Sequence, residues 1–203
     1  MINIAAAQRN SDGSPDENLA GMSKMIETAL AERENLDIIV FPEYCYRAPE
    51  TIKDSNQAED VPGEFTDKIG KMARKYNLNI IPGSIIEKAE GGKVYNTTVF
   101  INRKGEIIGK YQKIHLFDAI GFKESDYVQA GKEMCVIDTD LGRVGIMVCY
   151  DLRFPELARS MILQGANIIF VPSAFPSGNL LPPRTDHWDI LVRSTAILNL
   201  TYV

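Results

Sequence analysis

Two apolar runs of similar composition occur in the two halves of the chain, and they restrict the fold more than any other feature. They are LDIIVFPE at 36–43 and ANIIFVPS at 166–173, and each follows a segment with helical spacing of apolar residues. Each of those segments follows an apolar strand pattern, at 2–7 and 143–148. Strands this apolar are buried on both faces, with helices covering the sheet. The pattern predicts two strand-helix-strand units in a layered α/β domain, although chance similarity between buried strands is the alternative.

Hydrophobic periodicity and turn residues predict the other elements. The expected helices cover 14–33, 64–76, 155–164 and 187–200. The expected strands cover 2–7, 37–41, 79–86, 94–102, 107–111, 134–138, 143–148 and 167–171, with another beginning at Tyr202. The long polar segment 115–132 shows little periodicity, and a loop of that length is usually functional or disordered.

Composition excludes several classes of protein. The 203 residues carry a net charge of −5 and no basic stripe, which argues against nucleic-acid binding. No apolar run reaches the ~18 residues of a membrane span, and the apolar N-terminus is expected to be a strand and not a signal peptide. Three cysteines imply no disulfide framework, so we expect a reducing, cytoplasmic location. Two distant histidines leave few options for a metal site or a Ser-His pair.

Three residues that could carry chemistry follow predicted strands. Glu43 follows 37–41, Lys113 follows 107–111 and Cys149 follows 143–148. Each alone is most simply a loop charge, a solvated lysine or a small buried thiol. Together they supply a nucleophile, a cation that favours the thiolate, and a base that can take the thiol proton.

A thioester-forming reaction also needs donors for the oxyanion. The backbone N–H of Tyr150, next to the thiol, and the ammonium of Lys113 are the obvious candidates.

Three sequence blocks extend this interpretation. FPEY at 41–44, KYQKIHLFD at 110–118 and GIMVCYDLRFPEL at 145–157 resemble the signature regions of the nitrilase superfamily, the carbon–nitrogen hydrolases. The resemblance implies a four-layer α-β-β-α sandwich with a pseudo-twofold internal repeat. It also implies a catalytic triad, carried here by Glu43, Lys113 and Cys149.

The resemblance also implies a fourth catalytic residue. In the amidase-like branches a second glutamate lies between the lysine and cysteine blocks, and GFKESDYVQAG matches that pattern with Glu124. Glu124 is expected to orient the amide nitrogen or to assist the water.

KIHLFD, CYDLRFPEL, PSAF at 172–175 and the pair His187-Trp188 are similar to the ω-amidase and small-amide hydrolase branch. The implied enzyme hydrolyses a small linear amide, such as an ω-amide bearing a carboxylate, to acid and ammonia through a thioester. It needs no metal and no organic cofactor. The implied partners are the small-molecule substrate and further copies of the chain, in a homodimer or larger homo-oligomer, with no nucleic acid and no membrane.

Other residues near the three blocks are candidates for substrate binding. Arg153 could bind a substrate carboxylate, but we expect it mainly to form ion pairs with Asp151 and Glu156 that set the turn after the thiol. Tyr44 and Phe175 could form walls of the pocket or pack in the core. Ser173, beside Phe175, is the remaining candidate.

Departures from the family pattern keep other functions open. The segment LLPPRTDHW and the helix after Arg193 differ from the usual family sequences. We expect residues 1–203 to form one carbon–nitrogen hydrolase domain that lacks the family's C-terminal portion. The alternatives are an N-carbamoyl amine hydrolase, a nitrilase, a non-catalytic binding or assembly module and, less favoured, a redox-sensing thiol.

Overall fold

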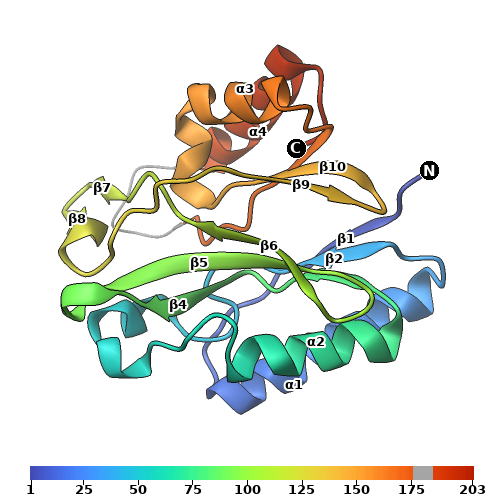
Figure 1. Cartoon of the computed structure of the whole chain (residues 1–203), viewed down its shortest axis with the longest axis horizontal. Helices are drawn as coiled ribbons and strands as arrows, with labels where there is room; N and C mark the ends of the chain where they lie inside the picture. Colours follow the sequence, from blue (N-terminus) through green and yellow to red (C-terminus); the bar gives the residue numbers. More distant parts are fainter. Residues whose placement is uncertain (176–184) are drawn as a thin grey trace.

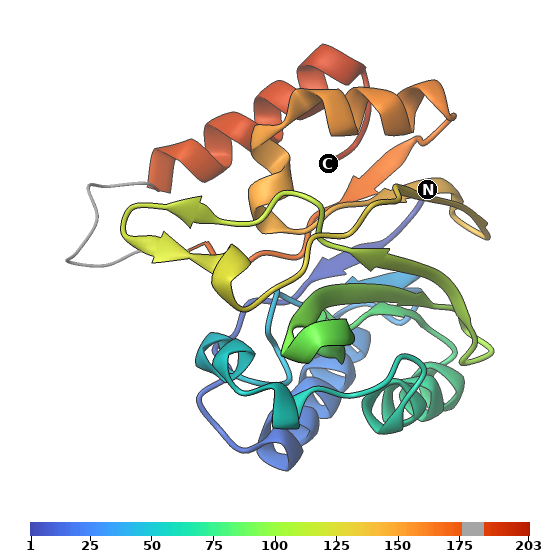
Figure 2. The same ribbon diagram turned by 60° about the vertical axis from the view of Figure 1, so that its left-hand side comes forward.

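The computed structural model describes residues 1–175 and 185–203 as a sandwich of four layers (Figures 1 and 2). Helices α1 and α2 cover the outer face of a six-stranded sheet. A three-stranded sheet packs on the inner face of the first sheet, and helices α3 and α4 cover it from outside. The expected α-β-β-α order is therefore present.

The bounds of the elements lie close to the expected ones. The helices are α1 Pro15–Glu32, α2 Glu64–Tyr76, α3 Pro155–Leu163 and α4 Thr185–Asn199. The larger sheet contains β1 Ile4–Ala6, β2 Ile38–Val40, β3 Asn79–Ile81, β4 Ser84–Lys88, β5 Val94–Ile101 and β6 Ile107–Gln112. The smaller sheet contains β9 Cys135–Thr139, β10 Gly142–Ile146 and β11 Ile168–Phe170. A separate hairpin pairs β7 Asp118–Ala119 with β8 Phe122–Lys123. Within these described residues, no helix has both the length and the apolar character needed to cross a membrane.

The internal repeat consists of two parallel strand-helix-strand units. Strands β1 and β2 are parallel neighbours joined through α1, and β10 and β11 are parallel neighbours joined through α3. The two similar apolar runs of the sequence are β2 and β11. Tyr202 forms a parallel bridge with Ile168 of β11, as the expected beginning of another strand.

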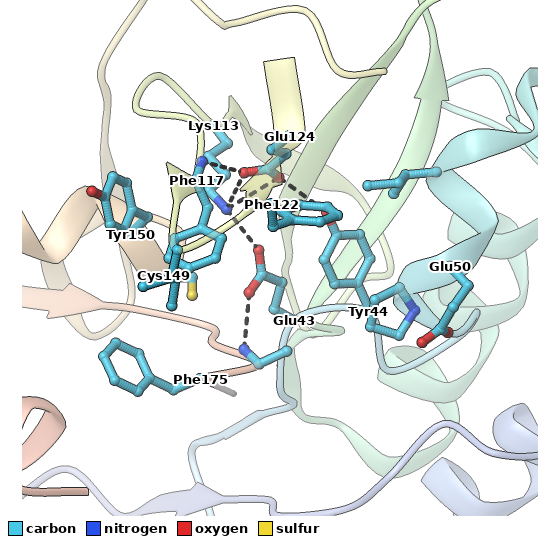
Figure 3. Close-up of a pocket in the computed structure, with 14 residues that line it drawn as sticks. Glu43, Tyr44, Glu50, Lys113, Phe117, Phe122, Glu124, Cys149, Tyr150 and Phe175 are labelled. Atoms are coloured by element: carbon cyan, nitrogen blue, oxygen red, sulfur yellow. Dashed lines mark hydrogen bonds and ion pairs between the residues drawn. The ribbon is translucent and has the colours of Figure 1, made fainter. Parts of the chain in front are cut away.

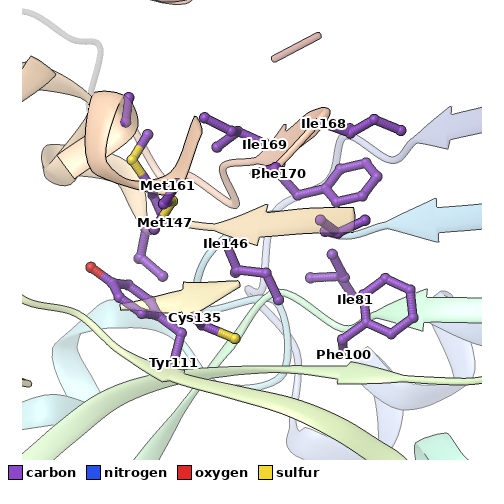
Figure 4. Close-up of a cluster of buried hydrophobic side chains, with 14 of the residues drawn as sticks. Ile81, Phe100, Tyr111, Cys135, Ile146, Met147, Met161, Ile168, Ile169 and Phe170 are labelled. Atoms are coloured by element: carbon purple, nitrogen blue, oxygen red, sulfur yellow. The ribbon is translucent and has the colours of Figure 1, made fainter. Parts of the chain in front are cut away.

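Alternate residues of the larger sheet divide between two hydrophobic cores. Ile38, Ile81 and Phe100 face the smaller sheet and pack with residues such as Ile146 and Phe170 (Figure 4). Their sequence neighbours in the same strands face α1 and α2. Because each fully buried large side chain contributes ~1.5–3 kcal/mol, these two cores supply most of the stabilisation. They hold the strand ends that carry the candidate site.

Local signals account for the helix ends that the sequence predicts well. Ser14 and Glu17 form a reciprocal capping box at the start of α1, where Pro15 takes the first helical position. Helix α2 ends at Tyr76 and is capped by Asn77, which adopts a left-handed conformation with φ of 50°.

The expected strand 79–86 is wrong as a single strand, because the run divides into β3 and β4. Gly83 adopts a φ of 78° between them, and a Cβ atom there would lie 1.9 Å from the carbonyl oxygen of Pro42. Only glycine permits this close approach. Since Pro42 precedes Glu43, the break in the strand makes room for the loop that carries that carboxylate.

Segment 115–132 is also more ordered than the sequence suggests. It contains the β7–β8 hairpin, whose two turn residues, Ile120 and Gly121, both have positive φ. A short 3₁₀ turn, Glu124–Asp126, follows the hairpin and places Glu124 in the interior. The expectation that this segment contributes to function is consistent with its position beside the candidate site.

Candidate active site

The side chains of the predicted triad meet at one end of the sandwich, beyond the carboxyl ends of β2, β6 and β10 (Figure 3). Nζ of Lys113 lies 3.1 Å from Oε1 of Glu43 and 2.9 Å from Oε2 of Glu124. The thiol of Cys149 lies beside Glu43, whose carboxylate raises the pKa of that thiol (Figure 3). All four side chains are buried. The geometry therefore brings together every residue that the sequence predicts to be catalytic.

The carboxylate of Glu43 is held from both sides. Its Oε1 contacts Lys113, and its Oε2 accepts a hydrogen bond of 2.9 Å from the backbone N–H of Ala174, beyond the end of β11. The next residue, Tyr44, has a φ of 57°, and its N–H donates to Ser84 Oγ. The two halves of the fold thus both fix the orientation of this carboxylate.

Cys149 is the first residue of a 3₁₀ turn, Cys149–Arg153, and its φ is 48°. A non-glycine residue in the left-handed region is strained, and such strain is typical of functional positions. The N–H of Cys149 donates to the carbonyl of Pro172 at 2.9 Å, which fixes the turn against the end of β11.

Electrostatics keep Cys149 protonated at rest. Burial and the neighbouring Glu43 carboxylate raise the pKa of the Cys149 thiol well above its usual value, and Lys113 offsets this only in part. Lys113 keeps its proton. Burial lowers the pKa of its ammonium, but Glu43, Cys149 and Glu124 raise that pKa by a larger amount, so the net shift is upward. The arrangement therefore suits a thiol that transfers its proton to Glu43 as it attacks, and not a preformed thiolate.

Glu124 belongs to the same network. Its Oε2 accepts a hydrogen bond of 2.6 Å from the N–H of Phe117, and its Oε1 accepts one of 3.1 Å from the hydroxyl of Tyr44. Burial and the charges of Glu124 and Glu43 raise the pKa of Tyr44, so its hydroxyl remains a donor. Tyr44 thus follows Glu43 in the sequence and donates a hydrogen bond to Glu124.

A cavity of about 420 Å³ opens onto these groups. Apolar and aromatic side chains form most of its wall. It is lined by Glu43, Tyr44, Pro49, Glu50, Ile52, Lys113, Phe117, Ile120, Phe122, Glu124, Cys149, Tyr150, Ala174 and Phe175. The predicted residues Tyr44, Tyr150 and Phe175 are among them.

The other two candidates for substrate binding do not line this cavity. The hydroxyl of Ser173 donates to the carbonyl of Val171. The guanidinium of Arg153 lies 5.8 Å from the ring centre of Tyr150 and 5.6 Å from that of Phe175, two residues that line the cavity. For both residues, substrate binding remains a prediction.

Asp151 has partners other than those the sequence suggests. It was expected to pair with Arg153, but its buried carboxylate accepts hydrogen bonds from the hydroxyl of Tyr111, from the N–H of Val148 and from the backbone of His115. Tyr111 and His115 flank Lys113 in the sequence. Asp151 therefore ties the cysteine turn to the segment that carries the lysine, and that expectation was wrong because the acceptor faces inward.

Sequence reasoning missed Asn96 of β5 and the apolar wall formed by Phe117, Ile120 and Phe122. The wall residues lie in the segment without periodicity, where no pattern separates lining residues from solvated ones. Asn96 had a weak signal, since asparagine is unfavourable within a strand. No group of three or more His, Cys, Asp or Glu side chains in the described parts of the chain is arranged to hold a metal ion.

Because three free thiols are buried, we expect the protein to lose stability at alkaline pH. Burial raises the pKa of Cys45 to about 12 and that of Cys135 to about 11, and the pKa of Cys149 is raised as well. Unfolded thiols ionise near pH ~8.5, so above that pH the unfolded state binds fewer protons than the folded state. The free energy of unfolding should fall by about 1 kcal/mol per thiol between pH ~8.5 and ~9.5.

Urea unfolding in a reducing buffer measures this effect. The double variant Cys45→Ala/Cys135→Ala should retain only about a third of the decline. An unfolding free energy that stays level over this range would show that the thiols ionise as readily in the folded chain as in the unfolded chain.

Comparisons with known proteins agree with the geometry. A model of the carbon–nitrogen hydrolase family matches residues 3–203. The omega-amidase NIT3 of Saccharomyces cerevisiae is 34% identical and aligns with 100% of this chain and 72% of its own length. The human omega-amidase NIT2 is 37% identical and aligns with 85% of this chain and 63% of its own length. The chain therefore spans only part of the length of these relatives.

Solved structures show the same fold. The crystal structure of yeast Nit3 superposes with a TM-score of 0.86 at 29% identity, covering 98% of this chain and 73% of that one. A carbon–nitrogen hydrolase from Helicobacter pylori superposes with a TM-score of 0.89 at 27% identity, covering 98% of this chain and 71% of that one.

Proposed function

Because this chain belongs to the carbon–nitrogen hydrolase family, we propose that it is a cysteine-dependent amidase that hydrolyses a small linear amide to an acid and ammonia. The observation that carries this proposal is the buried contact of Cys149, Glu43 and Lys113 at the base of a mostly apolar cavity. These three groups provide the nucleophile, the base and the cation that amide hydrolysis through a thioester needs. We assign residues 1–203 to a single domain of this family.

In the first step the thiol of Cys149 attacks the amide carbonyl carbon and its proton passes to Glu43. The carbon–sulfur bond forms while the carbonyl oxygen becomes an oxyanion. The ammonium of Lys113 and the backbone N–H of Tyr150, in the first turn after Cys149, would stabilise that charge. Both donors adjoin the nucleophile, so no large movement is required.

In the second step the carbon–nitrogen bond breaks. The nitrogen leaves as ammonia with the proton that Glu43 received, and the acyl group remains on the sulfur as a thioester. Water then attacks the thioester, Glu43 accepts a proton from it, and the acid leaves as the thiol is restored. Glu124 would orient the amide nitrogen or this water, since its carboxylate shares Lys113 with Glu43.

The cavity supports a small linear acyl group. Phe117, Phe122 and Phe175 offer apolar surface to an alkyl chain. The relatives named omega-amidases suggest an amide at the end of such a chain, with a carboxylate at the other end.

One observation favours a second candidate, an N-carbamoyl amine hydrolase. Glu50 lines the cavity with an exposed carboxylate, and an ammonium on the far end of a substrate would pair with it. Such an enzyme would release carbon dioxide and an amine together with ammonia. A nitrilase would release ammonia and an acid from a nitrile.

A matched set of substrates tests these functions. We expect ammonia release from amides of one chain length, namely butanamide, succinamate and 4-aminobutanamide, and not from butanenitrile. Carbon dioxide formed from carbamoyl amines would favour the second candidate. The Glu50→Gln variant should lower kcat/KM about fivefold for 4-aminobutanamide, because an exposed ion pair contributes up to ~1 kcal/mol, and leave butanamide unaffected. No release of ammonia from any of these compounds would favour a non-catalytic module.

A further inference from the structure

Asn96 occupies the centre of the network that joins the two carboxylates. It lies in β5 with a side chain that is only 1% exposed. Its Nδ2 lies 2.8 Å from Oε1 of Glu43, 2.8 Å from the hydroxyl of Tyr44 and 3.3 Å from Oε1 of Glu124. The backbone carbonyl oxygen of Asn96 also accepts a hydrogen bond of 2.9 Å from the backbone N–H of Lys113. One residue therefore contacts four members of the network.

The orientation of this amide follows from its neighbours. Two carboxylates accept hydrogen bonds and donate none when ionised, so the amide must turn its N–H₂ toward them. In the described part of the chain, Oδ1 of Asn96 is buried and accepts no hydrogen bond. An unsatisfied buried acceptor destabilises the fold, and that cost is tolerated where the other end of the amide has a required role.

The required role is to compensate negative charge. Among the described residues, Glu43 and Glu124 share the buried ammonium of Lys113, so one negative charge in this cluster has no cation of its own there. The N–H₂ of Asn96 adds donors to both carboxylates without adding charge. The hydroxyl of Tyr44 accepts a hydrogen bond from Asn96 and donates one to Glu124, so the second carboxylate gains a further donor.

We propose that Asn96 is a positioning residue, which holds the carboxylates of Glu43 and Glu124 in place and aimed at Lys113. This inference rests on the proposed function, because it assigns Glu43 the task of accepting the thiol proton. Asn96 is not among the described residues that line the cavity. It acts through the two carboxylates.

The variant Asn96→Asp tests this role because it preserves shape and replaces the donor with a third carboxyl group. A nearby negative charge favours the protonated form of a carboxyl group, so the acidic limb of kcat/KM should move about one unit to higher pH. We expect kcat at neutral pH to fall about 10²-fold through loss of orientation, with little change in KM. The matched control is Thr97→Val. It removes a buried hydrogen bond, from Thr97 Oγ1 to Glu87, on the opposite face of the same strand.

A second variant and a second readout separate this inference from the proposed function. Asn96→Ala removes the donors with a smaller side chain, and the rate at which iodoacetamide alkylates Cys149 reports proton transfer to Glu43 without any amide substrate. We expect slower alkylation with a shifted acidic limb in both Asn96 variants, and wild-type behaviour in Thr97→Val. An unshifted limb in folded Asn96 variants would overturn the proposal, whether or not their rates fall. Wild-type protein that alkylates normally but hydrolyses no amide would contradict only the proposed function.

Discussion

Replacing Cys149 with alanine is expected to abolish ammonia release, with a loss of at least about 10⁴-fold in kcat, while the fold is retained. The change removes only the sulfur atom, so the cysteine turn keeps its hydrogen bond from the N–H of residue 149 to Pro172. No other thiol can substitute, because Cys45 and Cys135 are buried outside the cavity lining. Ammonia release and circular dichroism of the same sample measure the two parts of this prediction.

The matched control for that variant is Cys135→Ala, which makes the same chemical change at a buried thiol of β9, in the core between the sheets. It should lose stability and keep its activity. Activity that persists in Cys149→Ala would rule out thioester chemistry at this residue.

Of the single substitutions predicted in this protein, Lys113→Met is expected to lower the free energy of unfolding the most. Methionine fills similar space, but it leaves Glu43 and Glu124 buried without their shared cation. Removing one partner of a buried ion pair costs ~3–5 kcal/mol, mainly because the remaining charge is uncompensated. Activity should also disappear, since the oxyanion loses a donor. Urea unfolding and ammonia release measure both effects.

The double variant Lys113→Met/Glu124→Gln shows whether charge is the cause. Removing one carboxylate together with the ammonium should restore part of the lost stability, and such coupling identifies a direct interaction. Activity should stay absent. If the loss of unfolding free energy in the double variant equals the sum of the losses in the two single variants, the buried ion pairs are not the source of the effect.

The fold could be predicted from the sequence largely because local signals agreed with the layered architecture. The helix Glu64–Tyr76 has the predicted bounds, and the two parallel units follow from the similar apolar runs that became β2 and β11. The break at Gly83 could not be predicted, because its cause is a contact with Pro42, which is distant in sequence. The β7–β8 hairpin was missed because its turn places Ile120, a β-branched residue, at a positive φ of 52°.

The candidate site divides in the same way. Glu43, Lys113 and Cys149 could be identified because each lies within three residues of the end of a strand, where the carboxyl ends of a layered α/β fold converge. Asn96 could not, since it lies inside β5 and its role depends on which side chains surround it. Asp151 was identified as structural, but its partners follow from the position of β6 and not from its neighbours in sequence.

The arrangement also explains why strain is located where it is. Tyr44 and Cys149 are both non-glycine residues at positive φ, and both line the cavity. One follows the proposed base, Glu43, and the other is the proposed nucleophile. The hydrogen bonds of Tyr44 to Ser84 and of Cys149 to Pro172 hold these conformations against their intrinsic cost.

The central claim is that the sulfur of Cys149 becomes acylated during amide hydrolysis. The most direct measurement is the mass of the protein quenched with acid during turnover of butanamide, followed by mapping of the modified peptide. The account predicts a mass increase equal to the acyl group, located on Cys149 and absent from the Cys149→Ala variant. Steady release of ammonia with no acyl adduct under conditions that trap thioesters, or an adduct located on Cys45 or Cys135, would contradict it.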